Sequence, residues 1–356
     1  MRYTWGMQRT IAILMVDGFT DSSLAIATDV LRTACSIAKR AGRAMRFRIV
    51  IASADGKPVR SAAGLQVGVQ HRFSRAVNAD VVLVPGLWAE SAADIDATLA
   101  RRDVQQLGRL AAQAYSKGAI IGAACSGTFV LAQAGLLDGR DCTTTWWLAP
   151  HFRALRPAAV LSSDRALVVD GRVLTAGAVF AQADLVLHLV ARYAGPGVAR
   201  QCTKLLLLDR HRSQGAYMAV QQLVANDASV RAAEAWIRAH VAQPFRITEL
   251  SRAVGVGART LARRITAAVG ISPLRLVQRL RVEAAVHLLE TTALSFEQIT
   301  ERVGYSDGNA LRRLLHREGL PNPSALRTPT QARSKTSAAR AKRSSVPRGH
   351  RRMAAT

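Results

Sequence analysis

Between residues 10 and 195, hydrophobic residues occur either in short continuous runs or in longer stretches where they recur every three to four positions. The short runs, at 10–16, 47–52, 81–84 and 119–124, are typical of buried strands, and the longer stretches, near 23–39, 103–116 and 127–136, are typical of helices. Strands that alternate with helices form a parallel sheet with helices on both faces. The pattern therefore predicts a doubly wound, flavodoxin-like α/β domain.

A second pattern occurs twice, in residues 249–265 and 298–315. In each copy apolar residues precede a glycine, and two more, four residues apart, follow it. In the first copy the glycine is Gly255 and the following pair is Leu261 and Ile265. Each copy predicts a short helix, a turn and a longer second helix, which is the plan of a helix-turn-helix. We therefore expect an all-α domain with two helix-turn-helix units after the α/β domain.

The polar face of each second helix predicts contact with DNA. Arginine can donate two hydrogen bonds to guanine, and asparagine can pair with adenine, in the major groove. The residues expected to face DNA are Arg259, Ala262 and Arg263 in the first unit and Asn309, Arg312 and Arg313 in the second. A basic helix that is merely solvated is the alternative for one isolated copy, but two copies at nearly the same spacing favour DNA recognition.

A long helix that starts at Ser272 and Pro273 is expected to join the two units, because serine caps helices and proline suits the first helical position. Residues 227–327 resemble the DNA-binding domain of AraC-type transcription regulators, in which two such units sit in successive major grooves. The resemblance rests on Gly257-Ala-Arg-Thr-Leu-Ala-Arg-Arg-Ile265, Gly270-Ile-Ser-Pro-Leu274, Arg281-Val-Glu-Ala-Ala285 and Val303-Gly-Tyr-Ser-Asp307. The second unit departs from the family pattern at Ala310-Leu311, where a small hydroxyl residue and phenylalanine are typical.

The formal net charge of +25 favours a polyanionic partner. Residues 328–356 contain eight Lys and Arg and no Asp or Glu, with almost no large apolar residues, so they predict a disordered basic tail. Such a tail adds nonspecific attraction to phosphates, although a merely solvated end explains it equally well. A purely architectural basic protein, without sequence preference, is a further alternative.

The four cysteines, Cys35, Cys125, Cys142 and Cys202, lack the spacing of a metal site, and so few in a long chain suit a reducing cytoplasm. We expect neither a metal nor a cofactor. The apolar residues 119–137 are interrupted by glycines and polar residues, so a strand followed by a helix explains them better than a membrane span. A soluble cytoplasmic protein is the expectation.

Cys125 directly follows the strand at 119–124 and precedes a helix. Ligands of such sheets bind outside the carboxyl ends of the strands. A nucleophile on such a turn is exposed, and the amino terminus of the helix would lower the pKa of its thiol. The alternative is a sheltered cysteine without a catalytic role, because catalysis also requires a positioned base.

The first domain resembles the PfpI-like fold, related to class I glutamine amidotransferases, in the form that GlxA-type regulators carry ahead of an AraC-type domain. The resemblance rests on Ala124-Cys-Ser-Gly-Thr-Phe-Val-Leu-Ala132, Gly135-Leu-Leu-Asp-Gly-Arg140, Thr175-Ala-Gly-Ala178, Asp184-Leu-Val-Leu-His-Leu-Val190 and Ser213-Gln-Gly-Ala-Tyr217. Peptidase relatives have a histidine where this chain has Ser126, and related regulators often have one where this chain has Thr145. No catalytic residue is therefore expected, and His151 is the nearest substitute for a base.

Together these patterns predict a transcription regulator that senses a small metabolite and binds double-stranded promoter DNA as a homodimer. The sensing domain is expected at residues 8–195, a linker at 196–226, the DNA-binding domain at 227–327 and the tail at 328–356. Whether the protein activates or represses is not specified by the sequence.

The candidate ligand residues are Asp29, Gly86, Trp88, Cys125 and Trp146. The resemblance implies an amino-acid or amine effector, and an aspartate with a tryptophan would suit a cation. The alternative from another functional class is a hydrolase or amidotransferase-like enzyme that uses Cys125.

Overall fold

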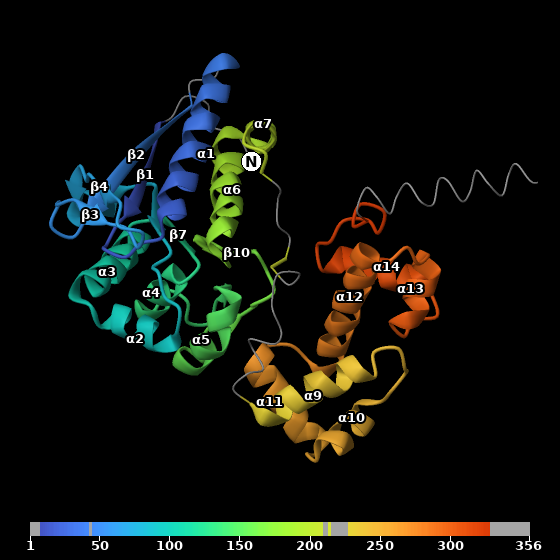
Figure 1. Ribbon diagram of the computed structural model, residues 1–356. Coiled ribbons are helices and arrows are strands. Elements are labelled where there is room, and N and C mark those ends of the chain that lie inside the picture. The colour runs from blue at the N-terminus through green and yellow to red at the C-terminus, as the bar shows by residue number, and fades with distance from the viewer. Residues whose placement is uncertain (1–7, 43–44, 209–212, 215–226, 328–356) are drawn as a thin grey trace, which may run out of the picture. The chain divides into compact units, whose positions relative to one another are not determined.

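The computed structural model describes residues 8–42, 45–208, 213–214 and 227–327, and the chain divides at Asp227 into two compact units (Figure 1). The first unit is built around a sheet, and the second is made of helices. The predicted tail at 328–356 and about half of the predicted linker, residues 209–212 and 215–226, lie outside the described residues.

A seven-stranded sheet forms the centre of the first unit, with the strand order β10-β11-β7-β6-β1-β2-β5. All neighbouring strands are parallel except β10 and β11. The strands are β1 (Gln8–Leu14), β2 (Arg46–Ser53), β5 (His71–Arg72), β6 (Val81–Val84), β7 (Ile120–Ala124), β10 (Leu167–Asp170) and β11 (Val173–Ala176). The four predicted strands are confirmed as β1, β2, β6 and β7. Every residue of β6 and β7 is buried, as expected for the middle of a parallel sheet.

Helices cover both faces of this sheet. Figure 1 shows α1 (Asp21–Arg40), α6 (Gln182–Ala194) and α7 (Pro196–Leu205) side by side on one face. The other face is covered by α2 (Ala92–Ala100), α3 (Arg102–Ser116) and α4 (Gly127–Gln133), which contact one another. The doubly wound, flavodoxin-like prediction is therefore confirmed.

Smaller elements fill the connections of the first unit. Strands β3 (Val59–Arg60) and β4 (Gln66–Val67) form an antiparallel pair, and β8 (Asp141–Cys142) and β9 (Val160–Leu161) form a parallel pair. The remaining elements are the 3-10 turns η1 (Phe73–Asn78), η2 (Trp146–Leu148) and η3 (Val179–Ala181) and the helix α5 (Ala149–Leu155).

The first unit extends beyond residue 195, where the sequence predicted the linker to begin. Helix α7 packs against α6 and α1, and its Val198, Ala199 and Cys202 belong to the same hydrophobic core as the sheet. Gln214 is also buried in this unit. The glycine and proline at 195–197 interrupt the helix without ending the domain, because the apolar face that follows them is buried against the same core.

The second unit consists of two helix-turn-helix halves joined by one long helix, as predicted. Its helices are α9 (Ala228–Ala239), α10 (Ile247–Val254), α11 (Ala258–Val269), α12 (Pro273–Thr291), α13 (Phe296–Arg302) and α14 (Gly308–Arg317). The turns contain Gly255 and Gly304, both with positive φ, and the Ser272 side chain caps α12 by accepting a hydrogen bond from the Arg275 N–H.

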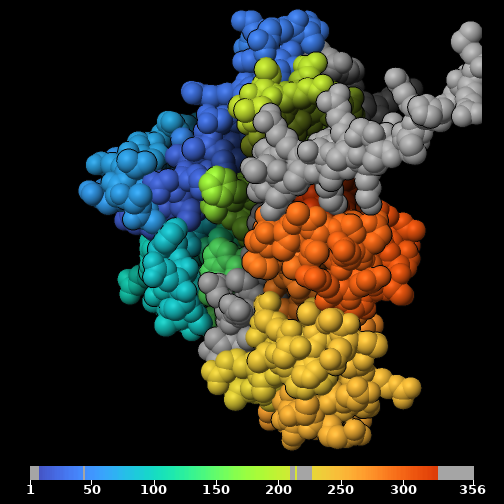
Figure 2. Space-filling model, turned by 45° about the vertical axis from the view of Figure 1, so that its right-hand side comes forward, coloured from blue at the N-terminus to red at the C-terminus, as the bar shows by residue number. Residues whose placement is uncertain are grey.

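Polar contacts of α12 fix the two halves to each other. Arg281 donates from Nη1 to the Gly304 carbonyl (3.1 Å) and from Nη2 to the Gln243 carbonyl (2.7 Å), so it joins the turn of the second half to the segment before α10. Arg275 pairs with the buried Glu318 carboxylate at 2.6 Å, which attaches α12 to the end of α14. Figure 2 shows the surfaces of the two halves adjoining, the first in yellow to light orange and the second in deeper orange.

Candidate functional sites

The second helix of the first helix-turn-helix, α11, presents the predicted basic face to solvent. Leu261 and Ile265 are fully buried, whereas Arg259 and Arg263 are exposed one helical turn apart. Ala262, between them, is half-buried and adds no bulk. Neither arginine makes a hydrogen bond or ion pair with any residue that the structure describes. The two guanidinium groups are therefore free to meet a ligand.

The corresponding face of α14 is already engaged within the protein. Arg312 lies over the Phe296 ring, 4.6 Å from its centroid, and donates from Nη1 to Asn309 Oδ1 at 3.2 Å. Arg313 Nη2 lies 3.9 Å from Asp307 Oδ2, and both side chains are well exposed. DNA contact through Arg312 or Asn309 would have to replace these contacts, so we expect this helix to contribute less to binding.

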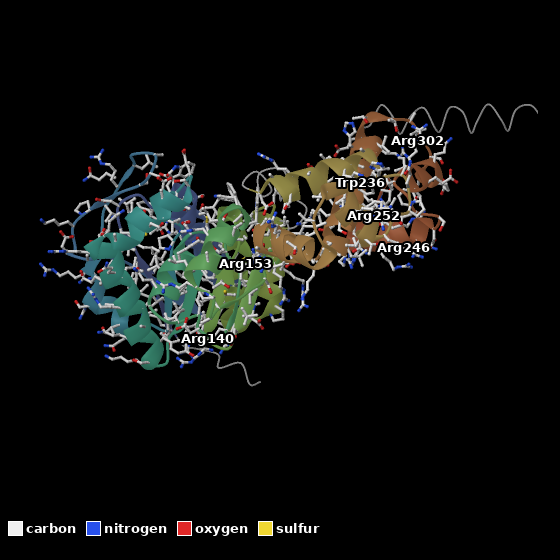
Figure 3. The ribbon with its side chains drawn as sticks, turned by 90° about the horizontal axis from the view of Figure 1, so that it is seen from below. Arg140, Arg153, Trp236, Arg246, Arg252 and Arg302 are labelled. Atoms are coloured by element: carbon white, nitrogen blue, oxygen red, sulfur yellow. The ribbon has the colours of Figure 1, made fainter. Side chains whose placement is uncertain are left out.

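Further exposed arginines lie in both helix-turn-helix halves. Figure 3 shows Arg246 and Arg252 in the first half, beside and within α10, and Arg302 at the end of α13 in the second. Exposed cationic side chains outside the recognition helices suit phosphate contacts, which position a protein on DNA without reading its sequence.

In the α/β unit, Cys125 occupies the turn between β7 and α4 with a φ of +54°. Positive φ is uncommon for a residue other than glycine and is typical of strained turns at functional sites. Of the two interpretations of the sequence, the structure agrees with the sheltered cysteine and not with the exposed thiol, because Cys125 is only 6% exposed. Burial raises the pKa of the Cys125 thiol, and the polar groups of Ser126 and Thr145 only partly oppose this effect. The net direction is therefore opposite to the lowering expected for an exposed nucleophile at a helix amino terminus.

The residues around Cys125 are bonded to the backbone and leave little space. A Cβ atom on Gly86 would lie 3.2 Å from the Cys125 Cβ and 2.9 Å from Thr20 Oγ1. Ser126 Oγ donates to the Leu87 carbonyl and accepts from the Leu87 N–H. Neither Ser126 nor Thr145, at the positions where relatives have a histidine, can act as a general base at neutral pH.

His151, the nearest substitute for a base, is engaged elsewhere. Its Nε2 lies 2.9 Å from Asp96 Oδ1 on α2, and its ring stacks on Phe129 with centroids 6.1 Å apart. These contacts give His151 a structural role between α5 and α2.

The structure does not gather the five predicted ligand residues into one pocket. Gly86 packs against Cys125, whereas Asp29 is exposed on α1 and Trp88 is 60% exposed, with Nε1 3.3 Å from Glu90 Oε1. Trp146 is buried and lines a cavity of about 620 Å³. Of the five, Trp146 alone lines this cavity among the described residues.

Two residues of that cavity, Ser213 and Gln214, were placed in the linker by the sequence. In the sequence, only the resemblance of residues 213–217 to related regulators marked these two residues. That resemblance did not indicate that either side chain would face a cavity. Residues so far along the chain reach the site only through tertiary folding.

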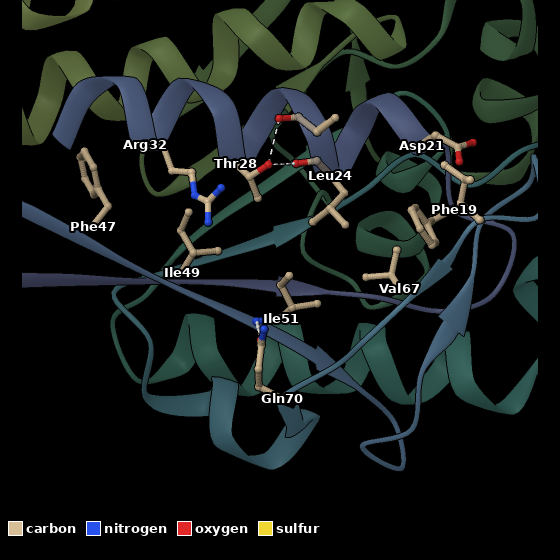
Figure 4. A pocket seen from close by; sticks show the side chains of 12 residues that line it. Phe19, Asp21, Leu24, Thr28, Arg32, Phe47, Ile49, Ile51, Val67 and Gln70 are labelled. Carbon is tan, nitrogen blue, oxygen red and sulfur yellow. Dashed lines mark hydrogen bonds between the residues drawn. The ribbon is translucent and has the colours of Figure 1, made fainter. Parts of the chain in front are cut away.

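A second hollow, of about 550 Å³, runs along α1 beside the edge of the sheet (Figure 4). Leu24, Ile49 and Val67 are among the apolar side chains that line it. Figure 4 shows Asp21 and Arg32 at opposite ends of the groove. One Asp21 carboxylate oxygen is buried without a hydrogen-bond partner among the described residues, and Arg32 is exposed.

Within the described part of the chain, no helix is both long and apolar enough to cross a membrane. Residues 119–137, which raised that question, form β7 and α4 instead. The same described residues contain no group of three His, Cys, Asp or Glu side chains that could hold a metal ion.

These features define a class of protein in which an α/β domain with a sheltered cysteine is joined to a double helix-turn-helix domain. The sequence profile of the DJ-1/PfpI family matches residues 9–192, and that of a helix-turn-helix domain matches residues 250–328.

Relatives share this organisation. The HTH-type transcriptional regulator GlxA of Rhizobium meliloti is 30% identical over 316 residues, which are 85% of this chain and 92% of that protein. The HTH-type transcriptional regulator GbdR of Pseudomonas aeruginosa is 29% identical over 300 residues, 83% of this chain and 78% of that protein. The regulator CdhR of the same species is 27% identical over 322 residues, 89% and 91% of the two chains.

The chain belongs to the DJ-1/PfpI family, in the branch whose members carry an AraC-type helix-turn-helix domain and regulate transcription. Both resemblances inferred from the sequence are thereby confirmed, and the protein is a DNA-binding transcription regulator.

Proposed function

We propose that this regulator reads promoter DNA mainly through α11 and senses a small molecule through its DJ-1/PfpI domain without catalysis. The observation that carries the DNA part is the pair Arg259 and Arg263, exposed on one face of α11 without partners among the described residues. Arginine donates in a fixed fork that matches the O6 and N7 atoms of guanine. The small Ala262 beside them allows the helix to approach the groove closely.

A binding experiment on duplexes selected from a random library tests this proposal. Changing Arg259 or Arg263 to Ala is expected to cost about 1 to 3 kcal/mol on the selected duplex, with relaxed preference at one base pair, and far less on a scrambled duplex. The measurement is fluorescence anisotropy over a salt series, because phosphate contacts alone depend steeply on salt.

Arg264 provides a matched control on the same helix. It is exposed like its neighbours, but its Nη1 donates to Ser229 Oγ at 3.0 Å, which directs it away from the proposed reading face. Arg264→Ala removes the same charge and should weaken both duplexes equally and modestly. If Arg259→Ala and Arg263→Ala behave like Arg264→Ala, these residues hold only phosphates and α11 does not read bases.

Several features support sensing without catalysis. The Cys125 thiol is buried, burial raises its pKa, and Ser126 and Thr145, at the expected base positions, supply no base. Its positive φ is the one observation that favours the second candidate, a Cys125-dependent hydrolase or amidotransferase-like enzyme. Steady turnover of an amide or ester substrate that disappears in Cys125→Ala would establish that candidate.

We further propose that the protein acts as a homodimer in the cytoplasm, where its DNA partner lies. The groove along α1 supports a contact with a second copy, because its charges are arranged for twofold symmetry. Asp21 and Arg32 are eleven positions apart on one helix, about 16 Å along the axis. Two antiparallel α1 helices would place each Asp21 beside the other copy's Arg32, which is the self-complementary arrangement of a twofold interface.

A further inference from the structure

The cavity lined by Trp146 has the size and composition of a small-molecule site. Its volume of about 620 Å³ falls within the range of ligand pockets, roughly 300 to 1,000 Å³. The wall combines Trp146 with Phe180 and Leu207. The side chains of Phe180 and Leu207 are 66% and 91% exposed, so large apolar surface is in contact with solvent at this cavity. A ligand would cover apolar surface that water now contacts.

The lining restricts the charge of the ligand. Among the described residues that line the cavity none is Asp, Glu, Lys, Arg or His, and the polar side chains are Ser213 and Gln214. A charged ligand would lose water here without gaining an ion pair from these described lining residues, which is costly. Asp29, the predicted partner of a cation, lies one helical turn beyond the lining residue Ile26 and is not part of the wall.

Gln214 offers one unused hydrogen-bond acceptor. Its Nε2 donates to the carbonyls of Ser163 (2.7 Å) and Thr144 (2.9 Å), while its Oε1 is buried without a partner among the described residues. Ser213 Oγ already donates to the Asp164 carbonyl. The group left for a ligand is therefore an acceptor, which calls for a hydroxyl or amide N–H on the ligand.

Gln214 also attaches its segment of the first unit to two loops that lie much earlier in the chain. The side chain is 4% exposed, and its backbone N–H donates to the Asp164 carbonyl at 2.9 Å. The DNA-binding unit begins thirteen positions later, at Asp227. Gln214 is therefore the last residue that the structure describes before the DNA-binding unit.

We propose that this cavity is the effector site, that it takes an uncharged, mainly apolar small molecule with a hydrogen-bond donor, and that Gln214 transmits its occupancy to the DNA-binding unit. This inference rests on the proposed sensing function and names the ligand class and the residue that reports it.

A matched set of probes tests the ligand class on the full-length protein. Phenylacetamide is neutral and donates hydrogen bonds, whereas phenethylamine and phenylacetate present the same ring with a positive or a negative charge at pH 7. Phenylacetamide should raise the melting temperature saturably, with an apparent affinity about tenfold or more above that of either charged probe. Equal or stronger binding of a charged probe, or no saturable shift with any of the three, overturns the proposed ligand class.

Substitutions at Gln214 and Gly177 test the coupling. A Cβ atom on Gly177 would lie 2.4 Å from Gln214 Oε1 and 2.6 Å from its Nε2, so Gly177→Ala displaces the amide without removing it. Phenylacetamide should change the affinity of the wild type for a selected DNA duplex, and this change should be lost in Gln214→Ala and in Gly177→Ala. In the double variant, Gly177→Ala should add little further loss of melting temperature, because its clash partner is gone.

Gln182→Ala is the control, since Gln182 is an equally buried glutamine that donates to the Ser23 carbonyl and does not line the cavity. It should retain the response to phenylacetamide. A response retained in Gln214→Ala, or lost equally in Gln182→Ala, overturns the coupling. The affinity of each variant for the selected duplex is also measured without phenylacetamide. If the unliganded variants still bind that duplex specifically, the coupling has failed but the proposed DNA-binding function has not.

Discussion

At the scale of single residues, Cys125 shows how one position can keep the geometry of a nucleophile without its chemistry. The turn between β7 and α4 holds it at positive φ, as a reactive cysteine would be held. Yet Gly86 and Ser126 close the space around it, and burial raises the pKa of the thiol. Reactivity requires the thiolate, so the raised pKa opposes catalysis more strongly than the turn favours it.

Alkylation rates check this conclusion. In native protein at pH 8, iodoacetamide should modify Cys125, Cys142 and Cys202 far more slowly than the half-buried Cys35. Burial raises the pKa of Cys142 to about 12 and of Cys202 to about 11, so their thiolate fractions stay small until well above pH 9, where an ordinary thiol is already ionised.

Mass spectrometry of digests, taken over a time course from pH 7 to 10, gives the rate at each site. Unfolded protein in guanidinium is the control, in which all four cysteines should react alike. Labelling of Cys125 in native protein as fast as in unfolded protein would contradict the sheltered assignment.

At the scale of elements, each helix-turn-helix turn contains a glycine with positive φ, but the space around the two glycines differs. Gly255 and Gly304 have φ values of +72° and +78°, a region that side chains with a Cβ rarely occupy. A Cβ on Gly255 would meet nothing within 4 Å, whereas one on Gly304 would lie 2.7 Å from the Val241 carbonyl and 2.8 Å from Arg281 Nη2. Gly304 therefore allows the close contact by which Arg281 joins the halves.

Alanine at each glycine measures this difference. Gly255→Ala should cost about 1 to 2 kcal/mol, the strain of a left-handed residue alone. Gly304→Ala should cost clearly more, because the Val241 carbonyl is backbone and Arg281 would lose its bond to Gly304. Urea unfolding of the two variants gives the comparison, and equal losses would show that the contact of Arg281 with this turn is unimportant for stability.

At the scale of the whole molecule, the groove along α1 predicts how two copies associate. Asp21→Arg and Arg32→Asp should each weaken the dimer by placing like charges together, and the double variant should restore it, because the exchanged charges again face opposite partners. Analytical ultracentrifugation at low and moderate salt measures the dissociation constants.

Asp29→Arg is the matched control for these charge reversals, since Asp29 is exposed on α1 but does not line the groove. It should leave the dimer intact. Single variants that dimerise like the wild type, or a double variant as weak as the singles, would assign the interface to another surface.

Local patterns were enough to predict most of the elements. Strands β6 and β7 are buried on both faces, so their sequences are continuous apolar runs that can be recognised without the structure. The helix-turn-helix halves were found because Leu261 and Ile265 repeat in Leu311 and Leu315 around a glycine turn. The outward direction of Arg259 and Arg263 follows from the same helical period.

Only the tertiary structure decided the environments that depend on residues distant in sequence. The space around Cys125 depends on Gly86, and whether Arg312 is free depends on Phe296. Gln214 has the sequence signature of a linker residue, but the loop carbonyls that bind it come from much earlier in the chain. The sequence by itself thus determined the class of fold and the two helix-turn-helix units, because periodicity is local, and its motifs carried the resemblance to the regulator family. Burial, pKa and the cavity were decided by folding, since each is set by the neighbours that the fold brings together.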